Sequence, residues 1–175
     1  MTRISWPLAA DIVSMASYVR VMTAPFSLLM AKSQSAQSSG RVFDAIAQAA
    51  EGAVQVPWGQ ISSAITRAHA DQSPAVGGGI AAPYAEVEGM EQSVCVFMSL
   101  PQGIELDSPD GEPVDLFFAF LWSPATSTHT RLRMRAEVSR HFKERKLGDV
   151  VRGAPDHDTR QAIFKEVWPT AGWLG

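Results

Sequence analysis

One stretch of the sequence, Val114 to Trp122, is almost entirely apolar and has the length of a single strand. It follows the turn-forming residues Asp110, Gly111 and Pro113, and it ends before Pro124. Neighbouring side chains of a strand point to opposite sides of a sheet, so an apolar residue at nearly every position means that both faces are buried. The stretch therefore predicts a central strand of a sheet that is covered by other elements on both sides.

Further strands and helices are expected on either side of this stretch. Ser93–Leu100 is rich in branched and aromatic residues and predicts a second buried strand, and Phe26–Met30 predicts another. Helices are expected over six segments, which are Pro7 to about Met22, Arg41–Ala53, Trp58–Ala70, Thr126–Lys143, Leu147–Arg152 and Asp158–Val167. Helices that alternate with buried strands predict an α/β fold in which one sheet carries helices on both faces.

The composition is that of a globular domain, with 175 residues, of which 46% are hydrophobic and 19% charged. We expect the main domain over residues 38–167, an N-terminal helix and strand segment over residues 1–37 packed on it, and an irregular tail over residues 168–175. The net charge of −3 gives no general attraction to nucleic acid, so no nucleic-acid partner is expected. The single cysteine, Cys95, excludes an internal disulfide, and its apolar neighbours predict a buried thiol.

The N-terminal stretch is apolar, but it does not have the pattern of a signal or membrane segment. Asp11 and Arg20 interrupt it, and Pro7 and Pro25 break it. A charged leader followed by an uninterrupted apolar core and a cleavage site is also missing from the sequence. We therefore expect no membrane insertion and a cytoplasmic location.

A run of three glycines, Gly77, Gly78 and Gly79, precedes the short apolar segment that leads to Pro83 and Tyr84. Consecutive glycines adopt positive φ without strain and let successive N–H groups converge on an anion. The same run is also what a surface turn before a strand requires. The glycines alone leave both interpretations open.

The sequence does not have the patterns of several other kinds of site. His69, His141 and His157 show no metal-ligand spacing with one another or with Cys95, so they are expected on the surface and no metal site is predicted. A P-loop and a nucleophile elbow are both missing from the sequence, and no cofactor is expected. The arginine-rich stretch from 131 to 140 indicates a solvated helix face or a surface for an acidic partner.

Two motifs carry a resemblance to a known family. One is GIAAPYA, from Gly79 to Ala85, and the other is DSPDGEPVDLF, from Asp107 to Phe117. In this order and spacing, with a later helix that opens on THT, the sequence resembles the enzyme IIA domain of the mannitol/fructose type in the bacterial phosphotransferase system, and most its nitrogen-regulatory branch. The resemblance spans about Ser38 to Lys165 and implies a single mixed sheet flanked by helices.

The resemblance also implies a site. In that family the residue after the proline is a histidine that accepts a phosphoryl group from a small phosphocarrier protein, and here that position is Tyr84. A phenol with a pKa of about 10 is protonated at neutral pH and is a poor substitute for an imidazole. By resemblance, His129 is the second histidine of the site, and Arg67 is the family arginine that contacts phosphate together with the glycines Gly77, Gly78 and Gly79.

These residues lead to one expected function and two alternatives. We expect a regulatory domain of the nitrogen-regulatory type that has lost histidine phosphorylation and binds a partner protein, either the phosphocarrier protein or a regulatory target. One alternative is an active phosphoryl carrier that uses His129. The other is a module that binds an anion or small molecule at the glycines. The sequence leaves open whether the chain forms a homodimer.

Overall fold

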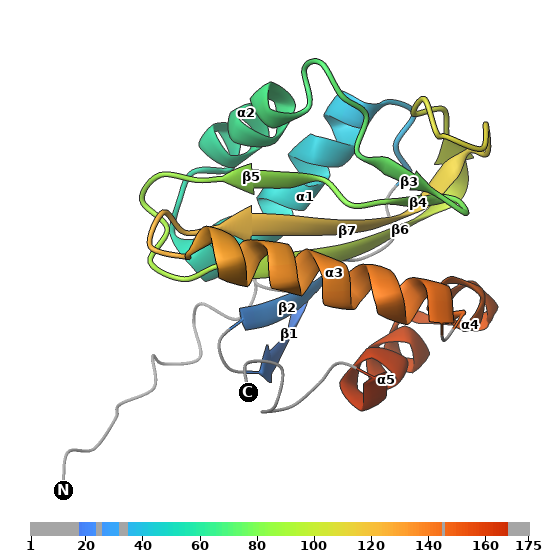
Figure 1. Ribbon diagram of the computed structural model, residues 1–175. Helices are drawn as coiled ribbons and strands as arrows, with labels where there is room; N and C mark the ends of the chain where they lie inside the picture. The colour runs from blue at the N-terminus through green and yellow to red at the C-terminus, as the bar shows by residue number, and fades with distance from the viewer. Residues whose placement is uncertain (1–17, 24–25, 32–34, 145, 168–175) are drawn as a thin grey trace, which may run out of the picture.

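The computed structural model describes residues 18–23, 26–31, 35–144 and 146–167 (Figure 1). The strands are β1 (Tyr18–Thr23), β2 (Phe26–Ala31), β3 (Ala75–Gly77), β4 (Ile80–Ala81), β5 (Tyr84–Glu86), β6 (Val94–Ile104) and β7 (Val114–Trp122). The helices are α1 (Ser39–Val54), α2 (Trp58–Ala68), α3 (Thr128–Glu144), α4 (Leu147–Gly153) and α5 (His157–Val167). Among these described residues, no helix is long and apolar enough to cross a membrane.

The strands form one seven-stranded mixed sheet in the order β1-β2-β6-β7-β4-β3, in which β5 also pairs with β7. β6 and β7 are antiparallel and interior, as their apolar sequences predict. β4 and β5 are both parallel to β7 and lie one after the other along the same edge of it. Ile80 of β4 is opposite Leu116, and Tyr84 of β5 is opposite Phe120.

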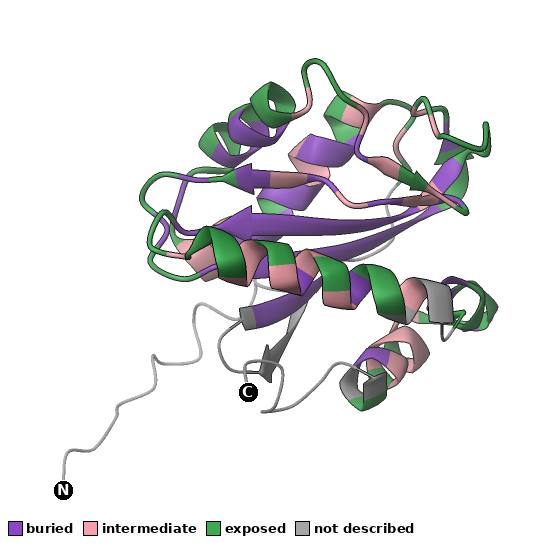
Figure 2. Cartoon of the chain, viewed as in Figure 1, coloured by how far each residue is buried: buried purple, intermediate pink, exposed green. Residues whose placement is uncertain are grey.

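Helices cover both faces of this sheet, with α1 and α2 on one face and α3, α4 and α5 on the other (Figure 1). Alternate residues of β7 enter two separate hydrophobic clusters, with Phe117, Ala119 and Leu121 toward α1 and Leu116, Phe118, Phe120 and Trp122 toward α3. Figure 2 shows that β7 is buried along nearly all of its length, and Asp115 is its one intermediate residue. The predicted α/β architecture with a central strand covered on both faces is confirmed.

Local signals place the helix ends close to the predicted ones. The Ser38 hydroxyl accepts a hydrogen bond from the Arg41 N–H (3.4 Å), so the serine-rich loop before α1 supplies its N-cap. α1 ends at Gln55, whose φ of 57° is left-handed and whose N–H bonds the Glu51 carbonyl. Cys95 is fully buried in β6, as its apolar neighbours predict, and burial raises the pKa of its thiol.

The helix expected from Pro7 to about Met22 is wrong over its described part, because Tyr18–Thr23 form strand β1. The residues before Tyr18 lie outside the described ones. β1 pairs antiparallel with β2, so the sheet takes up its backbone hydrogen bonds. The sequence YVRVMT alternates branched and aromatic residues with others, which suits a strand, and this local preference outweighs the apolar spacing of the longer segment.

Candidate functional site

Tyr84 opens strand β5, and the pairing of this strand with β7 fixes its position. The carbonyl of the preceding residue, Pro83, accepts a hydrogen bond from the Phe120 N–H (2.8 Å). The Tyr84 side chain is partly buried and packs on the hydrophobic cluster beneath α3. The ring therefore lies on the α3 face of the sheet.

Two arginines of α3 lie over this strand. The Arg135 guanidinium carbon is 4.2 Å from the centroid of the Tyr84 ring, a cation–π contact that contributes about 0.5–1 kcal/mol where solvent reaches it. One turn earlier, Arg131 forms an ion pair with Glu86 (2.5 Å) and donates to the carbonyls of Ser123 and Thr126. Among the described residues, no hydrogen bond or ion pair engages the Arg135 guanidinium, so its donors are open to a ligand.

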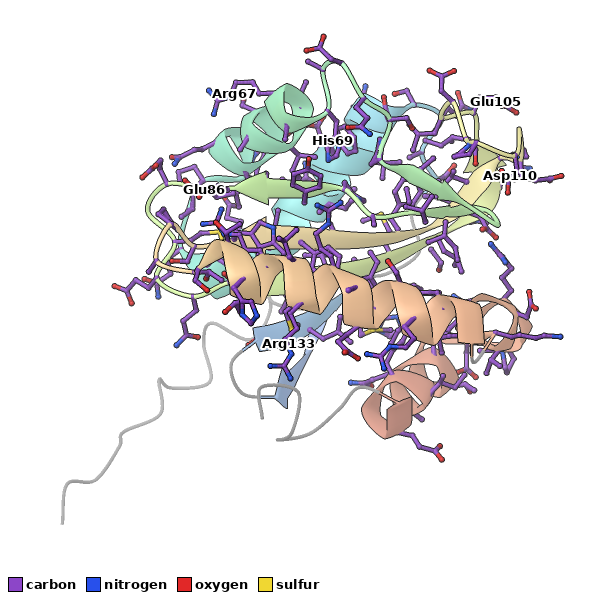
Figure 3. All side chains as sticks on the ribbon, viewed as in Figure 1. Arg67, His69, Glu86, Glu105, Asp110 and Arg133 are labelled. Carbon is purple, nitrogen blue, oxygen red and sulfur yellow. The ribbon has the colours of Figure 1, made fainter. Side chains whose placement is uncertain are left out.

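His69 comes directly after α2 and lies on the side of β5 away from α3 (Figure 3), and its ring packs edge-on against that of Tyr84. Its Nε2 accepts a hydrogen bond from the Tyr84 N–H (2.9 Å), and its Nδ1 lies 3.2 Å from the Gln72 carbonyl. A carbonyl only accepts, so Nδ1 carries the proton and the ring is neutral. Burial lowers the pKa of His69, and the nearby charge of Arg135 acts in the same direction. The expectation that His69 lies on the surface is wrong, because the ring is half-buried against Tyr84 at 4.9 Å between centroids.

We call His69, Tyr84, Glu86, Arg131 and Arg135 the Tyr84 cluster. The sequence indicated Tyr84, and it gave the arginine-rich stretch from 131 to 140 as a solvated helix face or a surface for an acidic partner, but it did not connect that stretch, Glu86 or His69 with Tyr84. The spacing of Arg131 and Arg135 is a usable signal, because residues four apart share one face of a helix. Arg133, between them, points away from β5 (Figure 3). His69 carried no comparable signal, since its contact joins segments that only the fold brings together.

The glycine run forms the turn between β3 and β4, and its three φ values of 94°, 64° and 70° are ones that favour glycine. The Gly78 N–H donates to the Asp110 carboxylate (2.6 Å), so the anion that this turn binds is supplied by the chain itself. The Asp110 carboxylate also accepts from the Ser108 hydroxyl and the Glu112 N–H. These donors, the hydroxyl first, lower the pKa of Asp110 to about 2.

Arg152 of α4 closes the other side of the turn. Its guanidinium binds both oxygens of Asp115 (2.8 and 2.6 Å) and donates to the Gly78 carbonyl (2.8 Å). Gly79 has a φ of 70°, which strains other residues, and a Cβ there would also lie 3.3 Å from the Pro113 carbonyl oxygen. The glycine run is thus explained by the left-handed backbone of the turn.

The predicted site residues occupy separate places. The glycine turn lies beside Leu116 and Tyr84 beside Phe120, four residues apart on β7, which is about 13 Å. His129 is exposed in the first turn of α3, six residues before Arg135 and so about 9 Å from it along the helix axis. Arg67 is exposed on α2 and points away from β5 (Figure 3). Within the described part of the chain, the structure does not gather the glycines, His129 and Arg67 around Tyr84.

The chemistry of the Tyr84 cluster suits binding. The lone pair of His69 Nε2 is taken up by the Tyr84 N–H, so this imidazole is not a free nucleophile. Among the described residues, no basic group forms a hydrogen bond with the Tyr84 hydroxyl. The open Arg135 guanidinium can bind an anionic group. In the described ranges, no three His, Cys, Asp or Glu side chains are grouped to hold a metal ion.

Comparisons with known proteins agree on one family. The model of the family described as phosphoenolpyruvate-dependent sugar phosphotransferase system, EIIA 2, matches residues 28–167. The nitrogen regulatory protein of Escherichia coli (strain K12) is 31% identical over 131 residues, which are 74% of this chain and 80% of that protein.

Solved structures share the fold at lower identity. Nitrogen regulatory protein IIA-Ntr from Neisseria meningitidis has a TM-score of 0.69 at 20% identity, and the match covers 78% of this chain and 91% of that one. Enzyme IIA mannitol, in its complex with phosphorylated enzyme IIB mannitol from Escherichia coli, has a TM-score of 0.61 at 12% identity, with 77% and 92% covered. These structures show a common fold with the mixed sheet described above.

Proposed function

Because the chain belongs to the EIIA 2 family of the phosphoenolpyruvate-dependent sugar phosphotransferase system, we propose that it is a regulatory protein that has lost histidine phosphorylation and binds a partner protein. The names of its relatives from Escherichia coli and Neisseria meningitidis support a nitrogen-regulatory role. In this proposal Tyr84 stands where the family has its phosphoacceptor histidine. The chain keeps the fold that presents this position and lacks the imidazole.

The observation that carries the proposal is the set of contacts around Tyr84. An acceptor must offer a nucleophilic nitrogen or oxygen at neutral pH, with a base or a low pKa to activate it. Tyr84 offers a phenol packed between Arg135 and His69, and neither is placed to remove its proton as a base. Arg135 is cationic, and His69 uses its lone pair for the Tyr84 backbone.

The same contacts support a binding role for this surface. Aromatic and arginine side chains are enriched among the residues that contribute most to protein–protein binding. A binding surface is therefore favoured where an aromatic ring is held rigidly beside an arginine whose charge is unpaired. Tyr84 is held from both sides, and Arg135 is available. A structural neighbour, enzyme IIA mannitol, has been solved with a phosphorylated protein partner, enzyme IIB mannitol. We therefore place the partner, the phosphocarrier protein or a regulatory target, at the Tyr84 cluster.

The test is a phosphorylation assay of the unmodified chain. The purified protein is incubated with phosphoenolpyruvate, enzyme I and the phosphocarrier protein, and its intact mass is measured under neutral conditions that preserve phosphohistidine. We expect no mass increase, while an active enzyme IIA in the same reaction gains one phosphoryl group. Stoichiometric acid-labile phosphate on the chain would contradict the proposal.

If phosphate appears, His129→Ala identifies its position. Loss of the label in this variant would establish the alternative of a phosphoryl carrier that uses His129. The remaining alternative, an anion module at the glycine turn, requires an external anion to displace Asp110 from the Gly78 N–H. Phosphate that perturbs the Gly78 amide resonance at millimolar concentration would support that alternative.

A further inference from the structure

A cleft of about 650 Å³ lies between the glycine turn and the C-terminal half of α3, with α4 at one end. We call it the α3–α4 cleft. Ile80, Ala82, Phe118, Val138 and Phe142 form its apolar lining. Its volume falls in the range of about 300–1,000 Å³ that is typical of sites for small molecules. The Tyr84 cluster lies further along α3 toward its N-terminus, so the cleft goes beyond the proposed function and does not depend on it.

The sequence explains why this space is open. Gly77, Gly78 and Gly148 contribute walls without side chains, and Ala82 contributes only a methyl group. A Cβ added at Gly78 would meet no atom within 4 Å, so the turn borders free space. Phe118 and Val138 are nearly completely buried at 1% and 5% exposure, so the cleft reaches down to the hydrophobic cluster under α3.

The charges at the rim differ in whether they are paired. Asp110 accepts three hydrogen bonds from Gly78, Ser108 and Glu112, and Arg152 is bound to Asp115. Asp149 is 3.7 Å from Arg152.

Lys146 is the exception among the charged residues that line the cleft. It is exposed before α4 with a φ of 48°, and no hydrogen bond or ion pair of its ammonium occurs within the described residues. Among the described residues, the cleft therefore combines an apolar interior with one open cation at its rim, which fits a molecule with an apolar body and one negative group.

We propose that the α3–α4 cleft binds a small amphipathic anion, such as a medium-chain carboxylate. The apolar body lies against Ile80, Phe118 and Phe142, and the anionic group lies at Lys146. Each methylene that enters the apolar interior strengthens binding by up to about fourfold, so affinity rises with chain length until the cleft is filled. A flat surface or a purely charged site would not show this dependence.

The first experiment titrates the full chain with decanoate below its micelle concentration and follows the amide resonances by NMR. We expect saturable binding of one molecule, with shifts concentrated on Gly77, Gly78 and Gly148. Octanoate should bind more weakly than decanoate. Decanol and decyltrimethylammonium, which have the same chain length without the negative charge, should also bind more weakly. Equal binding of the cation, or shifts spread over the whole chain, would contradict the proposal.

Two kinds of variant then locate the site. Ser139→Trp places a large ring on an exposed position of α3 at the cleft, and it should reduce decanoate binding at least about tenfold by occupying the space. Lys146→Glu should weaken decanoate by about tenfold or more through charge reversal and should leave decanol unchanged. Arg41→Glu makes the same charge change at an exposed position of α1 on the opposite face and serves as the matched control.

If Ser139→Trp does not fold, Val76→Glu replaces it, because Val76 is 52% exposed at the cleft and its replacement removes little buried surface. This variant should repel the carboxylate and weaken decanoate in the same way. Unchanged decanoate affinity in Lys146→Glu and in a folded cleft variant would show that the molecule binds elsewhere, and the proposal would fail.

Discussion

Two side chains, Asp110 and His69, have protonation states that follow from their surroundings. Asp110 receives hydrogen-bond donors only, which stabilise its charged form, whereas the burial of His69 favours its neutral form, and the free Nε2 of that form accepts the Tyr84 N–H. Both side chains hold a loop in place: Asp110 joins the β6–β7 loop to the glycine turn, and His69 joins the end of α2 to β5. At this scale the structure makes two predictions about pH.

The first prediction concerns the hydrogen bond from the Gly78 N–H to the Asp110 carboxylate. The Gly78 amide resonance should titrate with a midpoint near 2, because the pKa of Asp110 is lowered to about 2 from 3.8. The lowered pKa stabilises the folded chain above pH 3.8, and this contribution is lost as the pH falls toward 2. Asp110→Asn should abolish the titration and shift the Gly78 resonance. A midpoint at 3.8 would show that this hydrogen bond is absent in solution.

The second concerns His69, whose ring resonances should titrate below pH 6.5. The neutral form is favoured in the folded chain, so its contribution to stability is full above pH 6.5 and declines as the pH falls below that value. Arg135→Gln removes a positive charge beside the ring and should raise the pKa of His69. Arg133→Gln, on the same helix, is the control and should change this pKa less. A His69 pKa above 6.5 in the unmodified chain would contradict the neutral state of the ring that its burial favours.

The predictable helices and strands are those in which buried apolar residues recur with the spacing of a helix or a strand. β6, β7 and the five helices from α1 to α5 follow from such patterns, and their ends lie within a few residues of the expected ones. β3, β4 and β5 were not predicted, because each has at most three residues and depends on pairing with a neighbour rather than on its own sequence. β1 was missed because the apolar spacing of the longer segment from Pro7 indicated a helix, although the sequence YVRVMT suits a strand that pairs with β2.

The attachment of α5 gives a prediction about these elements. Phe164 is fully buried and contacts Phe97 of β6 at 4.5 Å and Phe118 of β7 at 6.2 Å between ring centroids. Phe164→Ala should lower the free energy of unfolding by about 3–5 kcal/mol, the usual cost of removing a buried ring. The measurement is urea unfolding at equilibrium. Val150→Ala, on α4 with 49% exposure, should cost less than about 0.5 kcal/mol, and similar losses in both variants would contradict this packing.

For the molecule as a whole, the sequence predicts the fold better than the site. The burial of each strand and helix is visible in its local pattern of apolar residues. The run of apolar residues in β7, for example, already predicts helices on both faces of the sheet. The Tyr84 cluster joins α2, β5 and α3 through side chains that are far apart in the sequence, and no local pattern records those distances. The motif around Pro83 indicated Tyr84, and the spacing of Arg131 and Arg135 indicated a shared helix face, whereas the contacts of Arg135 and His69 with Tyr84 could be found only once the elements were placed.

The central claim is that Tyr84 stands in place of an acceptor histidine on a fold that is kept. Phosphorylation of Tyr84→His by phosphoenolpyruvate, enzyme I and the phosphocarrier protein, measured by intact mass, tests it most directly. We expect the variant to gain one acid-labile phosphoryl group, because Arg135 is placed to stabilise the transferred charge. Tyr84→Phe should gain none, and adding Arg135→Ala to Tyr84→His should greatly slow the reaction. A Tyr84→His protein that keeps its circular dichroism and melting temperature and still takes up no phosphate would contradict the claim.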